Sequence, residues 1–348
     1  MTDLQGIVVL DLTRLLPGAV ATQYLADWGA EIVKVEQPGA GDYARAMSPS
    51  VFKRTNAGKK SIVLDLKNSR GREILISLAS TADVFIEGNR PGVMERLGLC
   101  YNELSAVNKR LIYASLTGYG QRGQYADLAG HDVNYLALGG VLSLNLPVIP
   151  GVQIADLVGG SMQTVMGVLL ALVARHRTGE GRHIDVSMYS GVTSLLTVPL
   201  AGWRDTGCEP KPGAEILSGR YACYNIYETA DGRWLAVGAL EPKFWAELCR
   251  RLGCEDLIPR QFEQSQDAVK ARVATIFRTK PAHVWFDQLR ESDCCVTPLR
   301  TVSEVAAELP DRDGPPPPAL GEHTFEVLSR AGLPRTELEE LKRQGVIA

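Results

Sequence analysis

Short apolar runs alternate with helix-like segments over the first third of this chain. The run from Ile7 to Leu12 (IVVLDL) is apolar almost throughout, which is typical of a strand buried on both faces of a parallel sheet. Pro17 suits the first turn of a helix that we expect to end at Trp28, before Gly29. Further strands are expected at 31–36, 61–66, 84–87 and 111–116, with a helix at 69–80. This alternation predicts a doubly wound α/β sheet.

The second half of the chain changes its pattern near Tyr221. Before it, a long helix is expected from Asp156 to Arg177, followed by a strand at 183–188. After it come a hairpin at 221–240 and helices near 243–252, 266–277 and 282–291. We therefore expect a large α/β domain at 1–200 that is completed by 319–348, a linker at 201–220, a small α+β domain at 221–304 and a proline-rich linker at 305–318.

The composition argues against several classes of protein, namely those that bind nucleic acid, a membrane or a metal. The net charge of -3 provides no general basic field for nucleic acid or an anionic membrane. Seven cysteines at irregular spacings predict reduced thiols in a cytoplasmic protein, and no Cys/His spacing predicts a metal site. The first residues lack the basic region of a signal peptide, and the longest apolar stretch, Val165 to Ala174, is too short to cross a bilayer. We expect a soluble cytoplasmic protein without a bound metal.

The first strand is not followed by a dinucleotide-binding motif. The segment Thr13-Arg-Leu-Leu-Pro-Gly-Ala19 lacks the G-x-G-x-x-G pattern that holds a pyrophosphate. A P-loop and a G-x-S-x-G nucleophile elbow are also missing from the sequence. The alternating α/β start therefore does not imply a nicotinamide cofactor.

Three residues are candidates for acid–base chemistry. His131 follows a glycine and opens an apolar segment, and the ordinary pKa of imidazole, about 6.5, suits proton exchange at neutral pH. Asp156 begins a helix, and Glu241 stands between the hairpin and a helix that starts at Pro242. Each has a structural interpretation as well: His131 and Asp156 as helix caps, and Glu241 as a carboxylate at a helix N-terminus.

The segment around Asp156 has a second expected role. A helix N-terminus presents free backbone N–H groups, so the Asp156 amide is a candidate donor to a developing enolate oxygen. Gly159 and Gly160 would let a ligand approach the backbone closely.

Several motifs together resemble those of the family III CoA-transferases, and within that family those of the alpha-methylacyl-CoA racemases. The matching segments extend over nearly the whole chain. The most specific are Glu87-Gly-Asn-Arg-Pro-Gly-Val93, Gly130-His-Asp-Val-Asn-Tyr135, Ala155-Asp-Leu157, Ala236-Val-Gly-Ala-Leu-Glu-Pro242 and Cys295-Val-Thr-Pro298.

The resemblance implies a fold and a set of roles. It implies a Rossmann-like large domain that binds CoA, a small α+β domain, and an interlocked homodimer whose active site lies between the large domain and the partner's small domain. In the racemase branch, His131 and Asp156 would form the acid–base pair, and Glu241 would hydrogen-bond the histidine. In the transferases, the aspartate at the position of Asp156 is a nucleophile, and the histidine is generally lacking.

Five basic residues are candidates for the CoA phosphates. Strand-end loops line ligand crevices in open α/β sheets. The candidates in or near such loops are Arg14, Lys59, Lys60, Arg90 and Arg96. The alternative for each is a solvated surface charge, because lysine and arginine are mostly exposed.

These residues predict an enzyme that acts on acyl-CoA thioesters. Inverting a stereocentre requires removal of a proton from one face and delivery to the other, which an imidazole and a carboxylate can do without a metal. We therefore expect a racemase of 2-methylacyl-CoA thioesters that needs no cofactor, since CoA is part of the substrate. The alternatives are an acyl-CoA:carboxylate CoA-transferase with Asp156 as nucleophile and a non-catalytic protein that only binds CoA or a protein partner.

Overall fold

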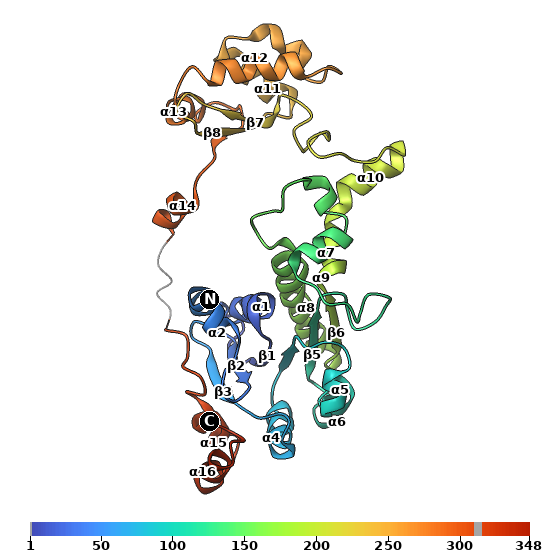
Figure 1. Ribbon diagram of the computed structural model, residues 1–348, viewed down its shortest axis with the longest axis vertical. Helices are drawn as coiled ribbons and strands as arrows, with labels where there is room; N and C mark the ends of the chain where they lie inside the picture. The colour runs from blue at the N-terminus through green and yellow to red at the C-terminus, as the bar shows by residue number, and fades with distance from the viewer. Residues whose placement is uncertain (1, 310–314) are drawn as a thin grey trace. The chain divides into compact units, whose positions relative to one another are not determined.

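A six-stranded parallel sheet is the centre of the first of two structural units in the computed structural model (Figure 1). The structure describes residues 2–309 and 315–348. The first unit contains 2–142, 148–198 and 315–348, and the second contains 143–147 and 199–309. The strands of the large sheet are β1 (Val8–Leu12), β2 (Glu31–Glu36), β3 (Lys60–Val63), β4 (Val84–Glu87), β5 (Ile112–Thr117) and β6 (His183–Ser187).

The order of the strands is β3-β2-β1-β4-β5-β6, so the direction of winding reverses between β1 and β4. Leu10 of β1 pairs in register with Val33 on one side and with Phe85 on the other. The segments that were predicted as strands from their apolar runs all lie in this sheet. Apolar runs predict such strands because a strand covered by helices on both faces must be apolar on both faces. The predicted α/β class is confirmed.

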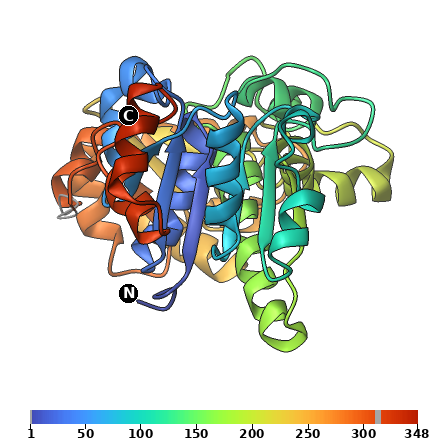
Figure 2. The same cartoon turned by 90° about the horizontal axis from the view of Figure 1, so that it is seen from below.

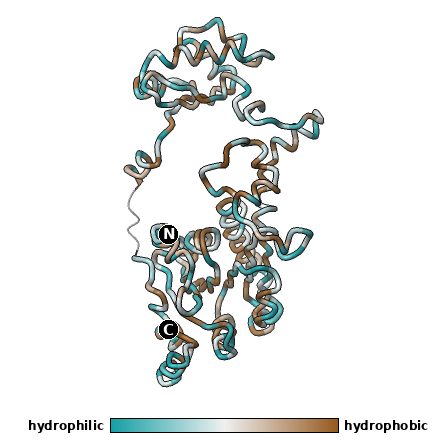
Figure 3. The backbone as a smooth tube through the Cα atoms, viewed as in Figure 1, coloured by the Kyte–Doolittle hydropathy of each residue, from teal (hydrophilic) through white to brown (hydrophobic). Residues whose placement is uncertain are grey.

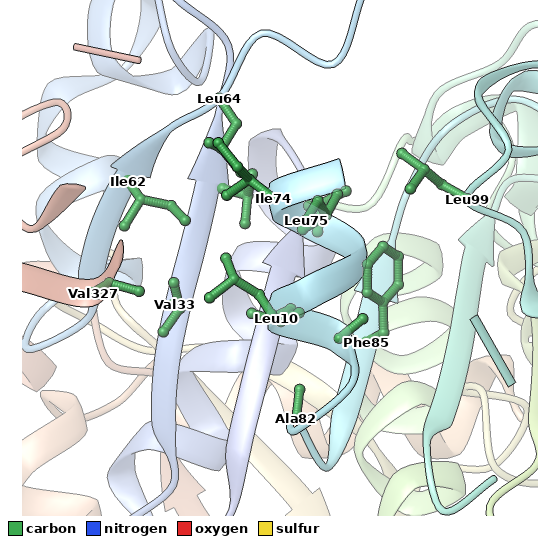
Figure 4. Packing of buried hydrophobic residues seen from close by; sticks show 14 of the residues in the cluster. Leu10, Val33, Ile62, Leu64, Ile74, Leu75, Ala82, Phe85, Leu99 and Val327 are labelled. Atoms are coloured by element: carbon green, nitrogen blue, oxygen red, sulfur yellow. The ribbon is translucent and has the colours of Figure 1, made fainter. Parts of the chain in front are cut away.

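Helices cover both faces of the sheet. On one face, α1 (Leu15–Asp27) and α8 (Gln163–Thr178) pack on the strands through Leu25, Val168 and Ala171. The other face carries α4 (Ser69–Ala79), α6 (Tyr101–Val107), α15 (Thr324–Arg330) and α16 (Arg335–Arg343). Figure 4 shows Leu75 of α4 and Val327 of α15 in the same cluster as Leu10 and Phe85. Figure 2 shows the C-terminal helices beside the strands, so the end of the chain completes the large unit.

The short helices of the first unit lie near the carboxyl ends of the strands and in the loops between them. They are α2 (Ala44–Met47), α3 (Pro49–Thr55), α5 (Val93–Leu97), α7 (Asp132–Leu138) and α9 (Met188–Thr193). The loop that follows α7 is coloured as hydrophobic in Figure 3, and it exposes Leu146, Val148 and Ile149.

The long helix predicted from Asp156 is present, but its first part differs from an α-helix. Residues Ala155–Met162 form a π-helical segment (η2) that continues directly into α8. Asp156 therefore lies inside the first turn, and the prediction that it is the N-cap is wrong. Gly179 ends the helix with a φ of 75°, as predicted.

The same helix, Ala155–Thr178, is long and apolar enough to cross a membrane by length and composition alone. The prediction that no apolar stretch could cross a bilayer counted only the run Val165 to Ala174. It left out the small and apolar residues in the first two turns of the helix. Within the unit the helix lies on the central sheet, where Val168 and Ala171 are buried. Only 33% of its most apolar window is buried within the described residues.

The second unit is a small α+β arrangement. Its antiparallel sheet has the order β7-β8-β9, formed by Tyr224–Glu228, Trp234–Gly238 and Val296–Pro298. The helices α11 (Pro242–Leu252), α12 (Asp267–Phe277) and α13 (Ala282–Leu289) close a core around Trp245, Phe277 and Trp285. The predicted hairpin and the three predicted helices are present, whereas β9 has only three residues and was not predicted.

The two predicted linkers are partly helical. Residues 201–206 belong to α10 (Thr197–Thr206), and residues 305–308 belong to α14 (Val302–Glu308). Thr301 accepts a hydrogen bond from the Glu304 amide and so caps α14. The prediction for 310–314 lies outside the described residues.

Candidate active site

A cavity of about 740 Å³ opens at the carboxyl ends of β1, β4 and β5 in the first unit. This is the edge where the winding of the sheet reverses, and ligands of doubly wound proteins bind at such a position. The wall is formed by the turn 13–18 after β1, the loop 88–91 after β4, the end of β5 with residues 118–119 after it, residues of the segment 126–135, and single side chains from other elements.

His131 lies in this wall as the N-cap residue of α7. Its backbone carbonyl accepts a hydrogen bond from the Asn134 amide at 2.8 Å, and its own amide donates to Asn134 Oδ1 at 3.1 Å. The structural interpretation is confirmed and is compatible with the functional one, because the backbone caps the helix while the residue is exposed at the cavity. Gly130 is required beside it, since a Cβ there would lie 2.8 Å from the Tyr135 ring.

Asp156 lies in the same wall, contributed by the first turn of the long helix. Burial and the neighbouring carboxylate of Asp132 raise the pKa of Asp156 to about 6, while the proximity of His131 opposes this shift. The structure thus brings together the imidazole and the carboxyl group that the sequence proposed as a pair. A carboxyl group with a pKa of about 6 can both take up and release a proton near neutral pH.

Replacement of Asp156 by asparagine is expected to raise thermal stability increasingly as the pH rises. The pKa of this carboxyl is 3.8 in an unfolded chain and about 6 in the fold, so the fold disfavours its ionised form. Below pH 3.8 both states are protonated and the penalty is absent; it grows between pH 3.8 and about 6 and is then constant. Melting curves of the Asp156→Asn variant and the wild type should diverge over this interval, and parallel curves would contradict the assignment.

The backbone around Asp156 differs from the prediction in two respects. The Asp156 amide, proposed as a donor to an enolate oxygen, donates to Asp132 Oδ1 at 3.0 Å, so this donor is already satisfied. Gly159 and Gly160 do not admit a ligand. A Cβ at Gly159 would lie 2.6 Å from the Met188 carbonyl oxygen, so these glycines allow close packing of the helix against α9.

Glu241 belongs to the second unit. It is the residue before α11, with Pro242 at the first helical position as predicted. The negative charge of Glu241 contributes to a raised pKa of the exposed Cys295 thiol, after the larger effect of burial. The predicted hydrogen bond between Glu241 and a histidine stays a prediction.

Only two of the five basic candidates line the cavity. Arg14 and Arg90 do so, and Arg14 donates to the Tyr43 hydroxyl at 3.3 Å. Arg96 is exposed on α5 and is not part of the cavity wall. Arg14 and Arg90 are therefore the two side chains of the predicted set that can meet an anionic ligand in this cavity.

The lysines of the predicted set are engaged elsewhere. Lys59 is fully buried, and its ammonium donates to Ala19 O at 3.0 Å, Thr22 Oγ1 at 2.7 Å and Asn56 Oδ1 at 3.0 Å. Burial lowers the pKa of Lys59 to about 7. Lys60 pairs with Glu326 at 2.6 Å. The prediction that these two lysines bind phosphates does not fit this geometry.

The sequence interpretation missed a buried ion pair beneath the cavity. Lys34, in the middle of β2, lies 2.9 Å from Asp42, and both side chains are fully buried. Although burial acts against the charge, the carboxylates of Asp11 and Asp42 hold the pKa of Lys34 above its ordinary value. A lysine between the valines of a predicted strand was the available signal, because a fully buried lysine requires a partner.

Comparisons with known proteins agree with this fold. A family model described as CoA-transferase family III matches residues 4–313. Alpha-methylacyl-CoA racemase from Homo sapiens is 36% identical, with 99% of this chain and 97% of that protein aligned. Acetyl-CoA:oxalate CoA-transferase from Acetobacter aceti is 37% identical over 88% of this chain and 82% of that protein. A crystal structure of a CAIB/BAIF family protein from Brucella suis has a TM-score of 0.79 at 28% identity and covers 95% of this chain and 99% of its own.

The fold and the cavity define a doubly wound α/β protein with a cavity at the switch point of its parallel sheet. The chain belongs to CoA-transferase family III, whose members similar to it include racemases and CoA-transferases. It is an enzyme of that family.

Proposed function

We propose that this enzyme is a racemase of 2-methylacyl-CoA thioesters. The observation that carries the proposal is the position of His131 and Asp156 in one cavity at the switch point. The pKa of Asp156, raised to about 6 by burial and by Asp132, suits a group that removes a proton in one direction and returns it in the other. The 36% identity to a human alpha-methylacyl-CoA racemase over 99% of the chain supports the same activity.

The reaction consists of two proton transfers. One of the two groups takes the proton from the carbon beside the thioester carbonyl, and the electron pair of the C–H bond moves onto the carbonyl oxygen to give an enolate. The other group then donates a proton to the opposite face of the same carbon, and the thioester carbonyl forms again. Each positioned acid or base contributes about 10²–10⁴-fold to the rate. Arg14 and Arg90 would bind phosphates of the CoA moiety at the rim of the cavity.

The working form is proposed to be a cytoplasmic homodimer in which Glu241 hydrogen-bonds the histidine of the other protomer. The apolar outer face of the long helix supports association. Met166, Leu170 and Val173 are 50%, 64% and 63% exposed, although they belong to a helix that otherwise packs on the sheet. An exposed apolar stripe of this kind marks an association surface. Light scattering after size-exclusion chromatography measures the mass directly, and a monomer at micromolar concentration would contradict the dimer.

Hydrogen exchange at the α-carbon tests the activity. The protein is incubated in deuterium oxide with (R)- or (S)-2-methylacyl-CoA and with no acceptor acid. The proposal predicts incorporation of deuterium at the α-carbon and conversion of either enantiomer to the mixture. Unchanged substrate from both enantiomers would refute it.

A CoA-transferase with Asp156 as nucleophile is the second candidate. The 37% identity to an acetyl-CoA:oxalate CoA-transferase and the position of Asp156 in the cavity favour it. It predicts turnover only with a second carboxylic acid and a covalent Asp156 adduct that hydroxylamine traps. The Asp156→Ala variant would remove both activities, whereas His131→Ala would remove racemisation and leave transfer intact.

A further inference from the structure

The turn after β1 holds a strained residue at the wall of the cavity. Leu15 has a φ of 61°, and it is one of two non-glycine residues with a positive φ in the described part of the chain. A bulky side chain rarely adopts this left-handed conformation, so the surrounding structure must hold it there. The turn is also tight, because a Cβ at Gly18 would lie 2.1 Å from Thr13 Cβ.

A buried ion pair holds this turn on both sides of Arg14. Lys34 Nζ donates to the Thr13 carbonyl oxygen at 2.9 Å, and the Leu15 amide donates to Asp42 Oδ1 at 3.1 Å. Lys34 and Asp42 are themselves 2.9 Å apart and fully buried. The residue between the two anchored peptide groups is Arg14, whose side chain lines the cavity. The pair therefore fixes the backbone from which this guanidinium projects.

The same aspartate also places the aromatic partner of Arg14. Asp42 Oδ1 accepts a hydrogen bond from the Ala44 amide at 2.9 Å, which fixes the backbone on either side of Tyr43. The Tyr43 hydroxyl accepts a hydrogen bond from Arg14 at 3.3 Å, and the guanidinium carbon lies 5.4 Å from the ring centroid. Both ends of the Arg14–Tyr43 contact are thus attached to one buried carboxylate.

We propose that Lys34 and Asp42 are positioning residues for the binding of CoA: they keep Leu15 in its strained conformation so that Arg14 and Tyr43 face an anionic group of the substrate. This inference rests on the proposed function, since it takes CoA as the ligand. A buried ion pair is rarely the most stable filling for its space, and apolar residues often replace one without loss of stability. Here the contribution of the pair is to fix the conformation of the turn after β1.

The test removes the pair without leaving a charge behind. In the variant Lys34→Met with Asp42→Ala, the remaining buried charges stay paired, because Asp11 keeps Lys59 at 3.6 Å and Glu36 keeps Arg45 at 2.7 Å. Titration calorimetry with CoA is expected to show a Kd raised by about tenfold, the loss of one charge-assisted hydrogen bond. The KM for the thioester should rise in parallel, while kcat stays within about threefold because the acid–base pair is untouched.

A matched control removes another ion pair of the same unit. Arg175 lies 2.9 Å from Asp83, at the amino end of β4 and away from the cavity. The variant Arg175→Met with Asp83→Asn should lower the melting temperature but leave the Kd for CoA unchanged. In the Arg14→Met background, loss of the Lys34–Asp42 pair should have little further effect on the Kd, since it acts through Arg14.

Three outcomes are distinguishable. A wild type that does not bind CoA would refute the proposed function. Wild-type affinity for CoA in the Lys34–Asp42 double variant, or an undiminished effect in the Arg14→Met background, would overturn the positioning role alone. If the double variant does not fold, Lys34→Met with Asp42→Asn keeps the shape at position 42 and also leaves no member of the pair charged. It should still raise the Kd, because the Thr13 carbonyl loses the hydrogen bond from Lys34, and an unchanged Kd in this folded variant would equally overturn the role.

Discussion

Replacement of His131 by alanine is expected to reduce racemisation by at least about 10²-fold, and by up to about 10⁴-fold. The substitution removes one of the two groups that must alternate between proton donor and acceptor, so neither direction of the reaction can be completed. The His131 backbone caps α7 through its carbonyl group, which alanine retains, so the fold should be kept. Chiral chromatography of the CoA thioester after incubation measures the rate.

A control separates this chemical role from a structural one. The affinity for CoA should stay unchanged in His131→Ala, because Arg14 and Arg90 are still in place. A His131→Ala variant that racemises the substrate at close to the wild-type rate would exclude the imidazole from the chemistry.

Replacement of Lys34 alone by methionine is expected to destabilise the first unit by about 3–5 kcal/mol. The substitution leaves Asp42 buried without its cationic partner and weakens the compensation of Asp11. Loss of both members of the pair should cost less, since no charge then stays buried alone. Urea unfolding followed by fluorescence measures the midpoint for the single variant, the double variant and the wild type.

The order of the three midpoints shows whether Lys34 compensates the buried charge of Asp42. The single variant should unfold first, the double variant later, and the wild type last or together with the double variant. If Lys34→Met unfolded at the wild-type midpoint, the loss of the cation would not destabilise the unit, and the predicted cost of leaving Asp42 unpaired would be refuted. The Arg175→Met variant, whose partner Asp83 is a quarter exposed, provides the comparison with a pair that water can reach.

Local patterns were sufficient for most of the large sheet because the strands β1 to β5 are buried on both faces. A run such as IVVLDL can be satisfied only in the middle of a layered sheet, so β1 and its neighbours followed from hydrophobicity alone. The three-residue strand β9 could not be predicted in this way. It is too short to show a period, and it forms because β8 offers it a free edge.

The site was predictable where chemistry depends on residue type and not where it depends on burial. His131 and Asp156 were proposed from the sequence as a proton-exchanging pair, and the fold brings both to one cavity. Lys59 was assigned to a phosphate because it precedes a strand, yet the fold turns its ammonium inward to Thr22 and Asn56. The direction in which a side chain points is set by tertiary packing, and the residues adjacent in the sequence do not encode it.

The Asp156 amide illustrates the same limit. Helix N-termini leave backbone donors free in general, which made this amide a reasonable candidate for an enolate. The side chain of Asp132, far from it in the sequence, reaches the amide in the folded chain. The π-helical turns at Ala155–Met162, where Gly159 packs against Met188, were likewise not predictable from local propensity.

The stereochemistry of exchange in single variants tests the central claim most directly. Asp156→Asn and His131→Ala are each incubated with the separate enantiomers of the thioester in deuterium oxide, and mass spectrometry follows the α-hydrogen. If the two groups work on opposite faces, each variant should exchange the α-hydrogen of one enantiomer only, without racemisation, and the two variants should select opposite enantiomers. Exchange of both enantiomers by either variant, or selection of the same enantiomer by both, would contradict a two-base mechanism.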